Sequence, residues 1–134
     1  MPDERRILGI DQGDRRVGLA ISDPLGITAQ GLDTFDRRGG DLMTHLRSIA
    51  DEYGVTAVVV GHPLSMSGRP SASSEKAEEL ARDIENTLKL PVTLWDERLS
   101  SVEAQRVLAG AKAGKKAVDR VAAVLILQSY MDSL

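Results

Sequence analysis

Four acidic residues stand at places in the sequence where carboxylates could act together. Asp11 ends the first apolar run, Asp96 and Glu97 follow the last short apolar run, and Asp119 comes just before the longest one, residues 121–127. The carboxyl ends of strands are where α/β sheets place their sites. If the first and last strands lie near each other and the last helix crosses the sheet, three carboxylates converge. Carboxylates placed in this way repel one another and lose solvation, so we expect raised pKa values or a bound cation that neutralises their charge.

A divalent cation is the partner that these side chains favour. The chain has no Cys and only two His, so its candidate ligand atoms are oxygens. Oxygen ligands suit Mg²⁺ or Mn²⁺ better than Zn²⁺. Two such ions roughly 3.5–4 Å apart can activate a water and stabilise the leaving oxygen of a phosphodiester. A metal-dependent site for phosphodiester hydrolysis is therefore one of two hypotheses for these acids.

A purely structural interpretation of the same acids is the alternative. Asp119 could be an acid in the first turn of a helix, where the macrodipole favours it by about 0.3–1 kcal/mol. Glu97 could pair with Arg98 on a loop. The spacing of the acids alone does not decide between a metal site and a structural role.

Two further motifs accompany the acids. Asp11, Gly13 and Gly18 form the pattern D-x-G-x-x-x-x-G, in which the glycines permit a tight turn and a close backbone approach. An isolated match of this kind is more typical of a glycine-assisted hairpin. His62 follows a β-branched run and could act as a general acid or contact a phosphate, although a loop histidine in a turn is the simpler interpretation.

Basic residues near these acids predict a surface that holds phosphates. The net charge of −3 argues against binding nucleic acid by overall charge, but the stretch from Glu97 to Arg120 has six basic and three acidic residues. Aromatic residues are scarce, so a base-stacking platform is not expected. The predicted nucleic-acid-binding residues are Arg15, Arg16, Arg98, Lys112, Lys115 and Lys116, with Arg106 and Arg120 nearby.

Length and composition predict one domain spanning residues 1–134. The chain is 42% hydrophobic and 28% charged, which suits a globular domain of about 100–150 residues. The longest apolar stretch is well short of the roughly 18 residues that cross a bilayer, and residues 1–6 are polar. We therefore expect no membrane span and no secretory signal. The absence of Cys is compatible with a reducing cytosol, so we expect a cytoplasmic protein.

Hydrophobic periodicity predicts the elements that must position the acids. Strands are expected at residues 6–11, 17–22, 27–35, 55–61 and 92–95, and a loop at residues 62–74. Helices are expected from Asp41 to Gly54, along Ala77 to Leu88, from the capping box Ser100-x-x-Glu103 to Gly110, and over residues 118–131, with a basic linker at residues 111–116. The last helix is apolar nearly all round between residues 121 and 127, so we expect it to be packed inside. The order predicts an α/β domain with a mixed sheet whose antiparallel part comes first.

Four segments resemble one family in order. They are Leu8–Asp23, Val59–Gly68, Asp96-Glu97-Arg98 with Leu99–Ser101, and Asp119 with Ala122, Ala123, Leu127 and Gln128. Together they resemble the YqgF/RuvX family, whose members are described as Holliday junction resolvases or as pre-16S rRNA nucleases. The resemblance covers nearly the whole chain, and four ordered motifs are specific where each alone is not.

The resemblance implies an RNase H-like fold with a five-stranded mixed sheet, three antiparallel strands first, flanked by helices. It implies a nuclease site of Asp11, Glu97 and Asp119 that binds Mg²⁺ or Mn²⁺. Asp96 is the alternative to Glu97, because side chains alternate across a strand. His62 departs from the family pattern and receives no catalytic role. The implied partners are precursor rRNA or branched DNA, together with ribosomal particles, and the oligomeric state stays open.

Two other functions fit parts of the sequence. The motif from Asp11 to Gly18 also resembles the phosphate-binding hairpin of actin-like ATPases and sugar kinases, which close two such domains around a nucleotide. This chain of 134 residues provides one. The other alternative is a non-catalytic module with an RNase H-like fold that binds nucleic acid or ribosomes.

Overall fold

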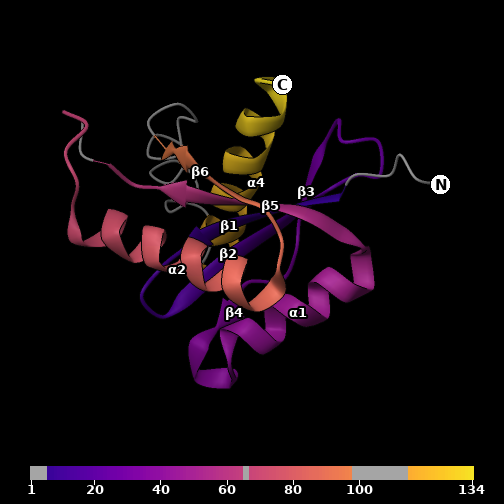
Figure 1. Ribbon diagram of the computed structural model, residues 1–134, viewed down its shortest axis with the longest axis horizontal. Coiled ribbons are helices and arrows are strands. Elements are labelled where there is room, and N and C mark those ends of the chain that lie inside the picture. The colour runs from indigo at the N-terminus through magenta and orange to yellow at the C-terminus, as the bar shows by residue number, and fades with distance from the viewer. Residues whose placement is uncertain (1–5, 65–66, 98–114) are drawn as a thin grey trace.

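A mixed β-sheet organises the part of the chain that the structure describes (Figure 1). The computed structural model describes residues 6–64, 67–97 and 115–134, except for the side chains of residues 115–119. Its elements are β1 (Arg6–Gln12), β2 (Arg16–Ser22), β3 (Ala29–Gly31), β4 (Phe35–Asp36), the 3₁₀ helix η1 (Arg37–Gly39), α1 (Leu42–Tyr53), β5 (Val55–His62), α2 (Ala72–Leu88), β6 (Val92–Asp96) and α4 (Lys115–Asp132).

The strand order places the ends of β1 and β6 on either side of β5. Five strands lie side by side in the order β3-β2-β1-β5-β6, and the short β4 pairs with β2. β1 and β2 are antiparallel, whereas β5 is parallel to β1 and β6 is parallel to β5. Helical crossovers make both parallel connections, α1 before β5 and α2 before β6. The predicted mixed sheet with its antiparallel part first is confirmed.

The third predicted strand is two strands. The expectation of one extended segment over residues 27–35 is wrong, because β3 and β4 pair with β2 in different registers. Ala20 pairs with Gly31 and Val17 pairs with Phe35, so two residues of β2 lie opposite three residues of the other chain segment. One extra residue in a ladder is a β-bulge, which leaves a residue unpaired and bends the strand.

Helix ends follow their local capping chemistry. α1 begins after Asp41, whose side chain accepts from the Thr44 backbone N–H at 3.0 Å, and ends at Gly54 with φ 66°. These are the predicted ends of the first helix. α2 begins earlier than predicted, because Ser71 caps it in a box with Ser74. The predicted loop over residues 62–74 therefore ends at Ser71.

Each face of the sheet has its own core. Residues alternate between the two faces of a strand, so Leu8 and Ile10 of β1 pack with α1 and α2, whereas Ile7 packs with α4. Figure 1 shows α1 and α2 on one side of the strands and α4 on the other. None of the helices in the described residues combines the length and the apolar character that a membrane-spanning helix needs.

The last helix is longer and more exposed than predicted. α4 begins at Lys115, so the last two residues of the predicted linker 111–116 are helical. Val121 is 36% exposed, and Val124 is only partly buried. The expectation that this helix is packed inside holds for the side that contacts the sheet, where Ala122, Ala123, Ile126 and Leu127 are buried. It is wrong for the outer side. The predicted helix from Ser100 lies outside the described residues.

Gly9 tests how closely α4 approaches the sheet. A Cβ atom at Gly9 would lie 2.7 Å from Leu127 Cβ, inside the normal contact distance. We expect Gly9→Ala to lower the free energy of unfolding by about 1–3 kcal/mol through overpacking, measured by urea denaturation. The matched control is Gly39→Ala, because no atom lies within 4 Å of a Cβ there. Equal stability of both variants would contradict this packing.

Candidate active site

Asp11 is a buried carboxylate on the α4 face of the sheet. It follows Ile7 and Gly9 at a spacing of two along β1, and these positions face α4. Its exposed fraction is 4%, although its neighbours in the α4 core are apolar. A charged group in such a place is costly unless it is compensated. Asp11 therefore has the burial expected of a functional acid.

Glu97 reaches the same face from the other side of β5. Trp95, two residues before it, is in the α4 core and donates from Nε1 to Ser129 Oγ at 3.0 Å. A Cβ atom at Gly61 would lie 3.3 Å from both Cγ and Cδ of Glu97. The Glu97 side chain thus occupies the space that Gly61 leaves open above β5.

Gly61 is the neighbour of Asp11 in the sheet. The parallel register pairs Ile10 with Val60, so the next residues along the two strands are Asp11 and Gly61. Sequence reasoning did not single out Gly61 as a site residue, although a glycine that closes a β-branched run signals a close approach. The Glu97 side chain therefore lies over the residue of β5 that neighbours Asp11 in the sheet.

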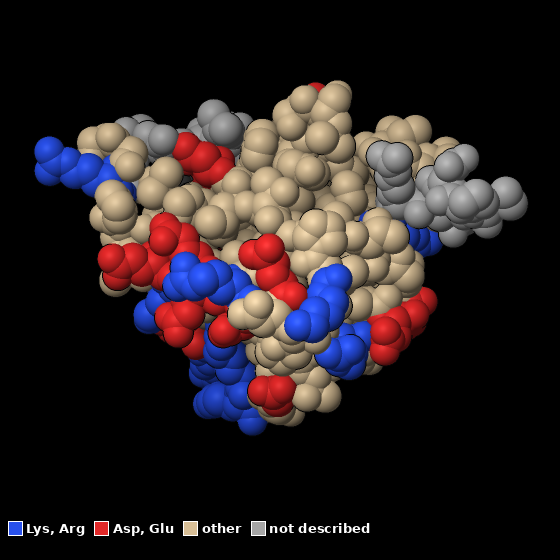
Figure 2. Space-filling view, viewed as in Figure 1, with Lys and Arg blue, Asp and Glu red and all other residues tan. Residues whose placement is uncertain are grey.

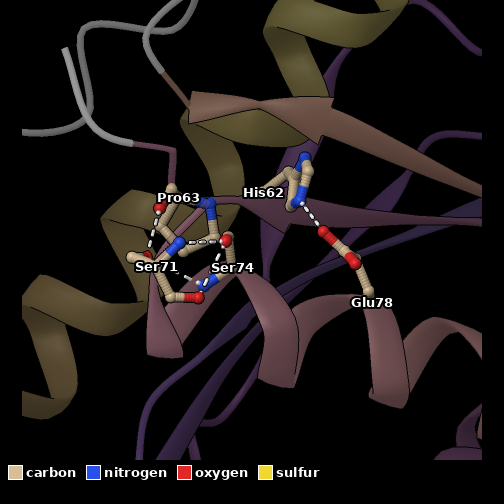
Figure 3. Close-up of polar contacts among 5 residues, drawn as sticks. All are labelled: His62, Pro63, Ser71, Ser74 and Glu78. Atoms are coloured by element: carbon tan, nitrogen blue, oxygen red, sulfur yellow. Dashed lines mark hydrogen bonds and ion pairs between the residues drawn. The ribbon is translucent and has the colours of Figure 1, made fainter. Parts of the chain in front are cut away.

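Asp96 and His62 belong to the opposite face. Leu94 packs against the α1 and α2 core, so alternation assigns Asp96 to that face as well. Asp96 is in register with His62, and His62 Nε2 lies 2.8 Å from Glu78 Oε2 of α2 (Figure 3). Ser71 Oγ donates to the Pro63 carbonyl at 3.3 Å and ties the chain after β5 to the start of α2. His62 is thus part of the α2 packing rather than of the carboxylate group.

The third predicted acid is placed only by its backbone. Asp119 lies in α4, one helical turn before Ala123, and its side chain is outside the described part of the structure. The Ala123 carbonyl oxygen would lie 3.4 Å from a Cβ at Gly9. Among the side chains that are described, no three His, Asp or Glu residues form a group that could hold a metal ion.

The predicted basic residues are placed unevenly. Arg15 and Arg16 flank the β1–β2 turn, and Arg15 Nε lies 3.1 Å from Asp36 Oδ2. Lys115 and Lys116 form the start of α4, without described side chains, and Arg98 and Lys112 lie outside the described residues. Among the predicted nucleic-acid-binding residues, the structure therefore describes the side chains of Arg15 and Arg16 only, at the β1–β2 turn.

A family model for RuvX, described as Holliday junction resolvase, matches residues 5–133. This chain belongs to the RuvX family. A Koribacter versatilis (strain Ellin345) protein named "Putative pre-16S rRNA nuclease" is 50% identical over 132 residues, which cover 95% of this chain and 86% of that protein. A Geobacillus kaustophilus (strain HTA426) protein of the same name is 47% identical, over 96% of this chain and 98% of that protein. RuvX membership supports the assignment of this chain as a nuclease.

Solved structures confirm the predicted RNase H-like fold of this RuvX protein. Thermus thermophilus RuvC in complex with a Holliday junction substrate superposes with a TM-score of 0.63, covering 96% of each chain at 16% identity. Thermus thermophilus RuvC described without a substrate gives a TM-score of 0.57. At such identities the likeness shows the fold alone.

Asp96 and Glu97 lie on opposite faces of the sheet, so substitutions of the two acids are expected to have different effects. We expect Glu97→Gln to lower nuclease activity at least about a hundredfold, the scale of losing a catalytic group. Asp96→Asn is the matched control on the opposite face and lowers activity less than about tenfold on the same scale. Single-turnover cleavage of a labelled RNA measures both. A larger loss in Asp96→Asn would reverse the assignment of the two acids.

Proposed function

We propose that this RuvX protein is a single-domain, metal-dependent nuclease that hydrolyses phosphodiester bonds of structured nucleic acid. The observation that carries the proposal is that the Glu97 side chain packs over Gly61. In the register of β1 and β5, Gly61 stands beside the buried Asp11. A fold needs no such pair for its stability, because two acids on one desolvated face repel each other. A reaction that requires a cation accounts for their placement.

The donor set fits Mg²⁺ or Mn²⁺. His45 stacks on Phe35 with ring centroids 4.5 Å apart, and His62 pairs with Glu78, so neither histidine joins the carboxylates. Oxygen ligands alone favour Mg²⁺ or Mn²⁺ over Zn²⁺. Asp11 and Glu97 would hold the ion, and Asp119 is the proposed third ligand, one helical turn from a residue that packs over Gly9.

In the proposed hydrolysis, the protein positions the carboxylates and the cation activates the reacting groups. A bound divalent cation supplies Lewis-acid activation of a water and of the leaving oxygen. The rigid end of β1 holds the Asp11 carboxylate in one position, and the packing of Trp95 against α4 does the same for Glu97. Preorganised charges of this kind need no rearrangement when the phosphorane charge develops.

Basic side chains would hold the phosphates that flank the cleaved bond. We propose Arg15 and Arg16 for the β1–β2 turn and Arg98, Lys112, Lys115 and Lys116 for the region that leads into α4. Each such contact releases counterions, so affinity depends steeply on salt. These contacts position the strand without reading its sequence.

The names of the relatives support precursor 16S rRNA as the substrate. Relatives that are 43–50% identical over nearly the full chain carry the name of a pre-16S rRNA nuclease. Branched DNA is the other candidate, because the family model is described as a Holliday junction resolvase. The assay therefore offers both a precursor-rRNA fragment and a four-way DNA junction.

The decisive test is the charge at residue 11. Asp11→Asn keeps the side-chain volume and removes the negative charge, so we expect cleavage in Mg²⁺ or Mn²⁺ to fall by at least about a hundredfold. Gel analysis of both substrates, with and without chelator, measures the loss.

The matched control is Asp51→Asn, an exposed acid on α1. It keeps wild-type cleavage, and circular dichroism checks that both variants fold. Undiminished cleavage by Asp11→Asn would refute the proposed site. Tight binding by the wild type without any cleavage would support a non-catalytic module instead.

A further inference from the structure

A polar pocket lies on the face of the sheet opposite the carboxylates, at the same end of β1. Gln12 directly follows Asp11, and alternation turns its side chain to the α1 and α2 face. The part of the pocket that reaches Gly13, which we call the inner part, has a volume of about 180 Å³. Its lining comes from the end of β1, the β1–β2 turn, η1 and α2, with residues Gln12, Gly13, Asp14, Arg37 and Lys76.

Arg37 lines this pocket and also has a hydrogen-bond donor without a partner. Its Nε atom is buried and has no hydrogen-bond partner among the described residues. Its backbone N–H donates to the Arg15 carbonyl at 2.8 Å, which fixes the start of η1 to the β1–β2 turn. A buried donor without a partner is costly in a folded protein. A bound acceptor would remove that cost.

Gln12 holds the guanidinium group in place. In the amide orientation that satisfies both neighbours, Gln12 accepts from Arg37 Nη2 at 2.9 Å and donates to the Lys76 carbonyl at 3.1 Å. The amide thus connects η1 to α2 across the end of β1. The guanidinium plane is preorganised, which favours binding of a planar or tetrahedral oxyanion.

The charges in the pocket favour an anion. Arg37 and Lys76 face a single carboxylate, Asp14, and Lys76 Nζ lies 3.0 Å from Asp14 Oδ1. The hydrogen bond and the charge of Lys76 lower the pKa of Asp14. This pair is highly exposed, so an incoming anion can compete for Lys76 at little cost.

The acids of the wider pocket limit where an anion can bind. Asp41 lies there as the N-cap of α1, bonded to Thr44, and Glu79 and Asp83 line the part along α2. These carboxylates repel an anion from the outer part. The inner part, beside Gly13, is the position where the cationic side chains dominate.

We propose that this inner pocket binds a phosphate group of the nucleic acid strand that lies in the active site. The inference rests on the proposed function, because it assigns the pocket to the same substrate. Adjacent residues of a strand are about 3.3 Å apart, so the pocket and the Asp11 carboxylate lie on the two sides of one strand end. A nucleic acid strand that passes around the β1–β2 turn would contact both the pocket and the Asp11 carboxylate.

The surface around the β1–β2 turn favours a phosphate that belongs to a nucleic acid strand over a free phosphate ion. Figure 2 shows Lys and Arg side chains gathered at the lower left of this view, with Asp and Glu side chains beside them, in the region where Figure 1 labels β4. Arg15 and Arg38 both form ion pairs with Asp36 of β4. A free phosphate needs only the pocket, whereas an extended anion uses the cations outside it as well.

The test removes the two cationic side chains of the pocket, one at a time, in a cleavage-deficient background. Arg37→Gln and Lys76→Gln are made in the Asp11→Asn protein, so that binding is measured without hydrolysis. The probes are a fluorescein-labelled RNA stem-loop and a labelled four-way DNA junction, each titrated at several salt concentrations. For the probe that binds, each variant raises Kd on the order of tenfold. Each also reduces the salt slope by about 0.7–0.9, the value for one phosphate contact.

The matched control is Arg82→Gln, which removes the same charge from an exposed position of α2 outside the pocket. It changes Kd less than about twofold, as expected for a distant exposed charge. Arg37→Lys keeps the charge but loses the planar donor set, so it retains the salt slope and only part of the affinity. This variant separates a lost phosphate contact from a disturbed η1.

Three results would overturn the inference. One is equal binding by Arg37→Gln, Lys76→Gln and Arg82→Gln. Another is failure of both probes to bind the Asp11→Asn protein. The third is a shift of the Arg37 and Gly13 amide signals on titration with inorganic phosphate, without any dependence of probe affinity on Arg37. None of these depends on cleavage, so the nuclease proposal stands or falls separately.

Discussion

The close approach of α4 to the sheet is the constraint on which the rest of the structure depends. Gly9, Gly31 and Gly61 lie on three different strands, and a Cβ atom at any of them would collide with a side chain of α4. Helix and sheet can therefore approach more closely than ordinary side chains permit. At Gly61 the same absence of a side chain admits Glu97. The missing glycine side chains thus allow the close approach of α4 and leave room for the Glu97 side chain on the same face as Asp11.

The cost of this arrangement is electrostatic. Asp11 is 4% exposed, and the Glu97 carboxyl group lies over Gly61 of the neighbouring strand. Like charges in a poorly solvated place destabilise a fold, and sites often trade stability for chemistry in this way. The Trp95 hydrogen bond to Ser129 and its edge-on contact with Tyr130 hold the end of β6 against that repulsion. Packing against α4 therefore fixes the position of β6, the strand that precedes Glu97.

The sequence predicts the regular elements better than the details of the site. Asp41 and Gly54 mark the ends of α1, because capping is a local effect that depends on a few residues. The bulge between β3 and β4 depends on pairing with β2, and no local pattern reveals it. The same holds for Glu97 and Asp96, whose faces follow from the register of β6 on β5 and from the glycine below. Arg37 carries no signal in the sequence, since its importance comes from burial by distant segments.

The end of β1 joins the two proposed binding points into one rigid unit. Asp11 and Gln12 are neighbours that point to opposite faces, and the turn after them cannot stretch. The Gly13 N–H donates to the Arg16 carbonyl at 2.9 Å, and a Cβ atom at Gly13 would lie 2.6 Å from that oxygen. A phosphate bound by Arg37 would therefore sit at a fixed distance from the Asp11 carboxylate. Binding energy gained at such a remote phosphate can orient the bond to be cleaved. The pocket would then select which phosphodiester along the strand reaches the acids, so the position of the cut follows from the geometry of the turn rather than from base recognition.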